Sequence, residues 1–286
     1  LEELSLLQQR FVSDVSHELR TPLTTIRMAA DVMYEDRGSF DMSTARSVEL
    51  LQEQLDRFES LLVDLLEISR FDAGAAVLET DRTNLVPMIE RIIHATGPLA
   101  QRNDVKVRFA TYERPAYVEC DPRRIDRVIR NLVDNGIEHA NGTDVVIELA
   151  GDPGAVAVTV RDFGVGLMPG EASLAFSRFW RADKARARTT GGTGLGLAIA
   201  LEDARLHGGW LEAVGEPGQG SCFRLTLPRI AGASFTTSPL PLDEGFSRAG
   251  EPGVTEQFKD QPPTETGLGT RARDPLDMAP WRRGGP

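Results

Sequence analysis

The sequence has few cysteines, no long apolar run and too little positive charge to balance its acidic residues. Its two cysteines, Cys120 and Cys222, lie far apart without metal-type spacing, which excludes a disulfide scaffold and indicates ordinary strand residues in a reducing compartment. No run of about eighteen apolar residues occurs, so nothing present is expected to span a membrane. The net charge of −11 argues against general nucleic-acid binding, so that a polyanion would need a local cluster of cations.

Residues 3–36 carry apolar side chains three or four positions apart, which predicts an amphipathic helix. His17 falls off the apolar stripe, so its imidazole is expected to face solvent, with the Glu18 carboxylate directly after it. Pro22 removes a backbone donor and is expected to bend the helix close to His17. An exposed imidazole beside a carboxylate is an available nucleophile, although an ordinary surface histidine also fits this stretch taken alone.

A second helix is predicted to begin near Ser43 and to end before the turn at Asp72–Gly74. It carries a heptad seam of apolar residues: Leu51, Leu55, Phe58, Leu62 and Leu65. Two such helices joined by a short loop form an antiparallel hairpin. Because one hairpin cannot cover both apolar faces, two copies are expected to pair into a four-helix bundle. The alternative is that these faces pack on a second domain.

Residues 82–228 alternate between β-rich segments and helical patterns. Strands are predicted at 105–109, 117–120, 145–149, 156–160, 210–214 and 222–227, and helices at about 87–101, 122–139 and 194–207. Asp121 and Pro122 mark the start of the middle helix as N-cap and first helical residue. Helices on one face of a mostly antiparallel sheet give an α/β sandwich. The Gly-, Pro- and Ser-rich residues 231–286 are predicted to be a disordered tail.

Two stretches of this region carry side chains suited to binding a ligand. Asn131 and Asn135 lie four apart, so both amides share one helix face, where an amide oxygen suits Mg²⁺ whose shell is completed by phosphates. An equally good interpretation of Asn131 and Asn135 is that they are two polar residues on a solvated helix face. Asp162 ends a predicted strand and can accept a hydrogen bond from an exocyclic amine, while Gly164 and Gly166 allow close backbone approach to a ligand. A tight turn is the alternative interpretation.

A third stretch, Gly192–Gly196, enters the helix 194–207, and backbone N–H groups at a glycine-rich helix start form an anion site. The preceding residues 178–188 contain five cations and one anion, with Arg178 and Arg181 among the cations. That composition, flanked by glycines, indicates a mobile lid whose cations meet the phosphates of a nucleotide. The alternative to a lid is a solvated basic loop without a binding role.

Taken together and in this order, these motifs resemble those of the sensor histidine kinases of bacterial two-component systems. The matching motifs are, in chain order, the H-box (His17–Pro22), the N-box (131–139), the G1 box (162–166), the F-box (176–181) and the G2 box (192–197). The resemblance covers about residues 1–228. Residues 11–25, 27–31 and 65–70 are most similar to an actinobacterial subgroup of the family.

The resemblance implies an α+β chain with two domains. The first is a helical hairpin that dimerises into a four-helix bundle, and the second is a separate ATP-binding domain. The hairpin for dimerisation and histidine phosphotransfer would comprise residues 1–74. A linker would follow at residues 75–81. A Bergerat-type (GHKL) α/β sandwich that binds ATP would comprise residues 82–230, with the tail at 231–286.

The resemblance also implies roles by position. His17 would accept the phosphoryl group, Glu18 would orient and deprotonate its ring, and Thr21 would help to position water during dephosphorylation of a partner. Asn135 would bind Mg²⁺ with support from Asn131. The remaining implied nucleotide contacts are Asp162 to adenine, Arg178 or Arg181 to the γ-phosphate, and Gly164, Gly166, Gly192, Thr193, Gly194, Leu195 and Gly196 around the phosphates. Glu138 departs from the pattern, because many relatives have lysine there.

The implied function is autophosphorylation of His17 from Mg·ATP and transfer to an aspartate of a cognate response regulator, with phosphatase activity toward that regulator. The chain begins with leucine in mid-pattern, so it is expected to be the cytoplasmic piece of a longer membrane protein whose earlier part carries the sensor and the membrane spans. One alternative is an ATPase of the same nucleotide-binding fold, although those families place a catalytic glutamate where this chain has Asn131. The other is a non-catalytic scaffold.

Overall fold

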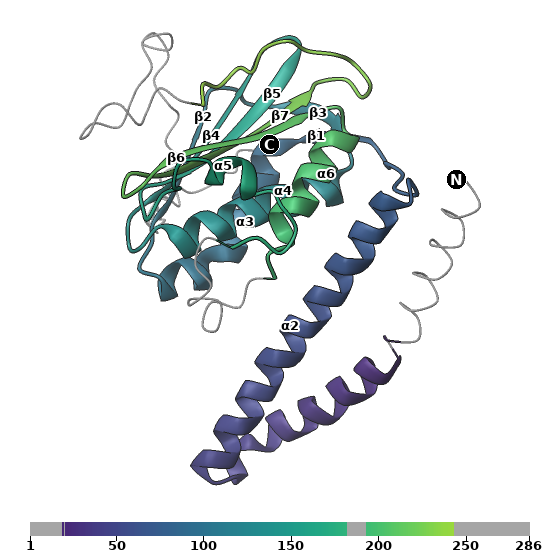
Figure 1. Cartoon of the computed structure of the whole chain (residues 1–286), viewed down its shortest axis with the longest axis vertical. Helices are drawn as coiled ribbons and strands as arrows, with labels where there is room; N and C mark the ends of the chain where they lie inside the picture. Colours follow the sequence, from purple (N-terminus) through teal and green to yellow (C-terminus); the bar gives the residue numbers. More distant parts are fainter. Residues whose placement is uncertain (1–18, 20, 182–192, 243–286) are drawn as a thin grey trace, which may run out of the picture.

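The computed structural model describes residues 19, 21–181 and 193–242 (Figure 1). Residues 21–35 are helical and lead through the 3₁₀ turn η1 (Asp36–Ser39) into the long helix α2 (Met42–Asp72). The Asp41 side chain caps α2 by accepting hydrogen bonds from the backbone N–H groups of Ser43 and Thr44. The predicted hairpin is therefore confirmed. The part that carries His17 and Glu18 lies outside the described residues.

The two hairpin helices bury a narrow seam and leave other apolar side chains exposed. Leu23, Ala30 and Leu55 are buried between the helices. Ile26 and Phe58 are about half exposed, at 51% and 50%. Pairing of two copies into a four-helix bundle, as the sequence predicts, would cover such residues and stays a prediction.

The second domain contains a five-stranded sheet in the spatial order β2-β4-β5-β7-β6. Its strands are β2 (Val107–Thr111), β4 (Val145–Gly151), β5 (Ala155–Asp162), β7 (Gly220–Pro228) and β6 (Trp210–Glu216). The β2–β4 pair is parallel and the other three pairs are antiparallel, which confirms the expected mostly antiparallel sheet. β1 (Asp81–Asn84) and β3 (Tyr117–Cys120) form a separate antiparallel ribbon.

Helices α3 (Leu85–Arg102), α4 (Pro122–His139) and α6 (Gly196–Leu206) cover one face of the sheet (Figure 1). α4 begins as predicted, with the Asp121 side chain accepting from the N–H groups of Arg123 and Arg124. Its fully buried face includes Ile129 and Leu132. Gly136 lets the helix approach the sheet, since a Cβ there would lie 3.3 Å from Val160. This packing sets the opposite face of α4 toward the site described below.

Three local details differ from the sequence predictions. β1 is not predicted, because its residues Asp-Arg-Thr-Asn show no apolar alternation, and it includes Asp81 of the expected linker. The short helix α5 (Glu171–Leu174) is also not predicted. α6 begins at Gly196 rather than at Gly194, because Gly194 has a φ of 71°, which is outside the helical region.

The predicted tail 231–286 is wrong for residues 231–242, here called the C-terminal strap. Leu240 of the strap is buried in a cluster with Ala150 and Ala157. The Phe235 ring lies 4.3 Å from that of Trp210, measured between centroids. The strap is polar enough to resemble a disordered segment, yet its few apolar residues cover small side chains on the sheet face that lacks helices. Residues 243–286 lie outside the described residues.

The two cysteines lie in strands, as predicted, and both are buried and free of disulfides. Burial raises the pKa of each thiol to about 11, so neither is a reactive thiolate near neutral pH.

Candidate functional site

A cavity of about 790 Å³ opens at the end of the second domain that faces the hairpin. Its walls come from α4, the loop after β5, α5, the residues before α6 and the start of β7, and α2 of the hairpin completes it. Seven of the predicted site residues line it: Asn131, Asn135, Gly166, Arg181, Thr193, Gly194 and Gly196. Residues more than a hundred positions apart in the chain therefore meet at one concave site.

The exposed face of α4 presents alternating amides and carboxylates to the cavity. Asn131 donates a hydrogen bond from its amide nitrogen to the Gly196 carbonyl, at 3.0 Å. Asn135, one turn further on, lines the cavity, and its side chain makes no hydrogen bond within the described part of the chain. One amide is thus held in place by the chain, while the other is available to a ligand.

Asp134 and Glu138 lie on the same face of α4 and also line the cavity. Burial raises the pKa of both carboxyl groups. The charge of Asp134 raises the pKa of Glu138 further, whereas the Arg181 guanidinium lowers it. Glu138, the residue that departs from the family pattern, thus adds negative charge where phosphates are expected.

Asp162 is not among the residues that line the cavity and is almost completely buried, at 1% exposure. One of its carboxylate oxygens accepts from the Gly164 N–H at 2.9 Å, and the other accepts from the Ser221 hydroxyl. Ser221 itself lines the cavity. The carboxylate is therefore rigidly oriented, and Ser221 is a site residue that sequence reasoning missed because its pairing depends on strand register.

The loop after β5 runs so close to the end of α4 that only glycine fits at position 164. A Cβ at Gly164 would lie 1.9 Å from the His139 carbonyl oxygen. The next residue, Val165, donates its N–H to that same carbonyl at 3.2 Å. Gly166 has a φ of 70°, which favours glycine. These contacts press the loop against α4 and shape one wall of the cavity.

The glycine-rich segment before α6 is anchored to both the cavity and the hairpin. The Thr193 hydroxyl donates to Asp64 of α2 at 3.0 Å and accepts the Leu195 N–H at 3.2 Å. Leu195 is completely buried with Ile68 of α2 and Ile199, so its side chain packs between the domains instead of facing the cavity. Gly192 lies outside the described residues.

The two predicted phosphate-binding arginines have different surroundings. Arg181 lines the cavity, near Glu138. Arg178 does not line it and forms a bidentate ion pair with Asp72 at the end of α2, with Nη1 at 2.8 Å from the carboxylate. Of these two arginines, Arg181 is therefore the one that faces the cavity.

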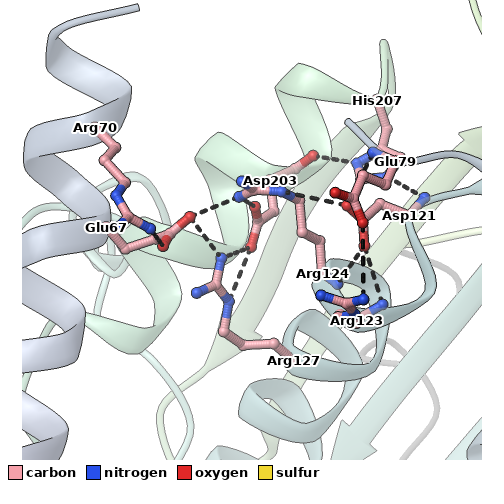
Figure 2. A network of polar contacts seen from close by, with 9 residues as sticks. All are labelled: Glu67, Arg70, Glu79, Asp121, Arg123, Arg124, Arg127, Asp203 and His207. Carbon is pink, nitrogen blue, oxygen red and sulfur yellow. Dashed lines mark hydrogen bonds and ion pairs between the residues drawn. The ribbon is translucent and has the colours of Figure 1, made fainter. Parts of the chain in front are cut away.

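Polar side chains also join α2 to the second domain (Figure 2). Glu67 of α2 accepts from Arg124 at 2.7 Å and lies 3.5 Å from Arg127. Both arginines also contact Asp203 of α6, which is completely buried. Behind them, His207 donates from Nδ1 to the Asp203 carbonyl, an assignment that follows because its Nε2 accepts the Asp121 N–H at 2.9 Å. Burial lowers the pKa of His207.

The remaining predicted residues belong to the hairpin. Thr21 is exposed, and its carbonyl accepts from the Thr25 hydroxyl at 3.2 Å. His17 and Glu18 lie outside the described residues. Arg57, Ser60 and Asp64 line the cavity from α2, and sequence reasoning missed them, since nothing in a heptad helix marks which polar residue meets another domain.

Two family models match the chain in the order of its two domains. Residues 7–74 match the His Kinase A (phospho-acceptor) domain, and residues 120–231 match the histidine kinase-, DNA gyrase B- and HSP90-like ATPase. The sensor histidine kinase MtrB of Mycolicibacterium paratuberculosis is 56% identical over 242 residues, which cover 85% of this chain. The chain belongs to the histidine kinases. The kinase spans 43% of the length of that relative.

Two solved structures have a similar fold. Full-length ShkA in complex with AMPPNP superimposes on this kinase with a TM-score of 0.67 at 24% identity, covering 79% of this chain and 47% of ShkA. The histidine kinase ThkA in complex with the response regulator TrrA gives a TM-score of 0.54 at 25% identity, covering 80% of this chain and 63% of that one. Within the described ranges, the kinase has no helix long and apolar enough to cross a membrane.

Proposed function

We propose that this kinase phosphorylates His17 from Mg·ATP and passes the phosphoryl group to an aspartate of a response regulator. The observation that carries the proposal is the position of the cavity. Its amides, glycine segments and Arg181 belong to the second domain, but its last wall is α2, which packs against the helical residues 21–35 that follow His17 in the sequence. Phosphoryl transfer depends mainly on alignment and charge neutralisation, and both need the donor to lie beside the acceptor helix.

The nucleotide would lie with its adenine toward Asp162 and Ser221 and its phosphates toward α4. Each oxygen of Asp162 already accepts one hydrogen bond, which fixes the orientation of the carboxylate, and each keeps a lone pair that could accept from the adenine amino group. Arg181 and the N–H groups of the segment Gly192–Gly196, which leads into α6, would contact the phosphates.

The residues at the phosphate end fit Mg²⁺. Asn135 offers an amide oxygen with no hydrogen-bond partner among the described residues, with Asn131 held beside it by the Gly196 carbonyl. Within the described ranges, no three His, Cys, Asp or Glu side chains cluster as metal ligands, which suits an ion that keeps water and phosphate in its shell. Bound Mg²⁺ would neutralise phosphate charge, a need made greater by the carboxylate of Glu138.

At the acceptor, Glu18 would hold the His17 ring in the reactive tautomer and stabilise the imidazolium that forms on attack. Thr21, four residues after His17 in the sequence, would position water when the kinase dephosphorylates its regulator. All three residues belong to the H-box, and their roles stay proposals.

The partners follow from the relatives. The similar kinase ThkA is solved in complex with a response regulator, and the identity to MtrB makes an MtrA-like regulator the partner that we propose. It would dock around residues 24–30 and 48–60 of the hairpin. We also propose that the kinase is a homodimer on the cytoplasmic side of a membrane, anchored by a preceding region.

Labelling with [γ-³²P]ATP tests the acceptor. The unchanged chain should take up acid-labile label, and His17→Gln should take up none. His94→Gln, at an exposed position of α3, is the matched control and should label normally. Persistent label in His17→Gln would refute the acceptor assignment. Release of inorganic phosphate many times faster than labelling would instead favour a simple ATPase.

A further inference from the structure

One wall of the nucleotide cavity comes from the hairpin, and among the described residues of that wall the cation is Arg57. The residues that α2 contributes among those described are Arg57, Ser60 and Asp64, spaced three and four apart on one helix face. Asp64 is already engaged with Thr193 of the glycine-rich segment, which marks this stretch of α2 as adjacent to the phosphate end. Arg57 lies about two turns earlier on the same face.

The Arg57 side chain has no partner within the described ranges. The residue is partly buried, yet its guanidinium makes no hydrogen bond or ion pair with any residue of the chain that the structure describes. Other arginines of the same helix are paired, Arg46 with Glu49 and Arg70 with Glu67. An arginine that faces a cavity and has no carboxylate partner is positioned to bind an anion.

The described residues line the cavity mainly with negative charges, so the positive charge of Arg57 is a large share of what could attract an anion. Among the described lining residues, four carry carboxylates: Asp64, Asp134, Glu138 and Glu171. The arginines among the described lining residues are Arg57 and Arg181. Because Arg178 is paired with Asp72 outside this lining, one of the two guanidiniums among the described lining residues comes from the hairpin.

We propose that Arg57 binds the terminal phosphate of a nucleoside triphosphate held by the second domain. The inference rests on the proposed function and goes beyond it, because it makes the hairpin part of the nucleotide site. Its contact would be a charge-assisted hydrogen bond from the guanidinium to a phosphate oxygen, made across the domain boundary. Arg57 is thus a binding and positioning residue for the donor phosphate.

This contact would couple nucleotide binding to docking of the two domains. The contacts of Glu67, Ile68 and Asp72 with the second domain do not involve nucleotide. The Arg57 contact would exist only with a triphosphate in the cavity, so the triphosphate should favour the docked arrangement and docking should tighten triphosphate binding to the same degree. Loss of the terminal phosphate would remove the contact.

Calorimetry on the full chain with Mg²⁺ tests the proposal with AMPPNP, ADP and AMP. Arg57→Ala should weaken AMPPNP binding about tenfold, the loss of one charge-assisted hydrogen bond in a partly solvated site. ADP binding should change much less and AMP binding should not change. Arg57→Lys, which keeps the charge but loses the planar fork, should lie between the two. Arg46→Ala, on the same helix away from the cavity, is the control and should match the unchanged chain.

A second measurement reports docking directly. Hydrogen exchange of α2 should slow around residues 57–68 when AMPPNP binds to the unchanged chain, and should slow less in Arg57→Ala. Equal AMPPNP affinity in Arg57→Ala and the unchanged chain would overturn the proposal, and so would an equal loss for all three nucleotides. If the unchanged chain binds none of them, the proposed function itself fails, which the same titrations reveal before any variant is compared.

Discussion

Replacing Asp203 with asparagine would remove a buried negative charge that two arginines share. The carboxylate is completely buried and accepts three hydrogen bonds, from Arg124 Nη1 at 2.9 Å and from Arg127 Nε at 3.1 Å and Nη2 at 2.6 Å. Asparagine keeps the shape of the side chain. Its one amide oxygen cannot serve both arginines, and its NH₂ group would face a guanidinium donor.

The size of the stability loss depends on which contacts Arg124 and Arg127 keep in the variant. Removing one partner of a buried ion pair costs about 3–5 kcal/mol, because the other charge stays buried without compensation. Arg124 and Arg127 keep contacts to Glu67, and their side chains are 16% and 28% exposed. Both facts favour the lower end of the range, so we expect Asp203→Asn to lower the free energy of unfolding by about 3 kcal/mol.

Urea unfolding followed by tryptophan fluorescence measures this loss. Trp180 and Trp210 both belong to the second domain, so their emission reports its unfolding. With a slope near 2 kcal/mol per molar urea, the midpoint should fall by about 1.5 M. Asp126→Asn is the matched control on α4. Its ion pair with Arg130 is partly exposed at 3.1 Å, so we expect a loss below about 1 kcal/mol.

An unfolding free energy for Asp203→Asn within about 1 kcal/mol of the unchanged chain, at the same slope, would contradict the reasoning. It would mean that water or a rearranged side chain compensates the two guanidiniums, and that the α2 contact through Glu67 does not depend on Asp203.

Two further predictions concern the rest of the second domain. Burial lowers the pKa of His207 below its ordinary value of 6.5, so the native state binds fewer protons than the unfolded one. The free energy of unfolding should therefore be fully maintained above about pH 6.5 and fall as the pH drops below it, and urea unfolding of His207→Gln over the same pH range should show a smaller slope. A chain ended after Ile230 lacks the C-terminal strap and should unfold with about 2 kcal/mol less free energy than one ended after Leu242, because Leu240 no longer covers the sheet. Equal melting temperatures of the two truncated chains would show that the strap contributes nothing.

Several features were determined by the sequence alone because their causes are local. The N-cap and first-turn proline at Asp121–Pro122 lie within three residues of the N–H groups that they serve, so α4 was predicted with its observed bounds. The 3.6-residue period placed Asn131 and Asn135 on one face. The ordered set of five motifs was enough to indicate the family.

Other features were decided only by tertiary structure, because they join residues far apart in the chain. Ser221 meets Asp162 through the register of β5 on β7, and a pattern of alternating residues does not set register between distant strands. Arg178 pairs with Asp72, and Leu195 is buried against Ile68, because α2 docks on the second domain. Periodicity shows that a helix face is apolar or charged, but the partner of that face depends on how whole domains pack.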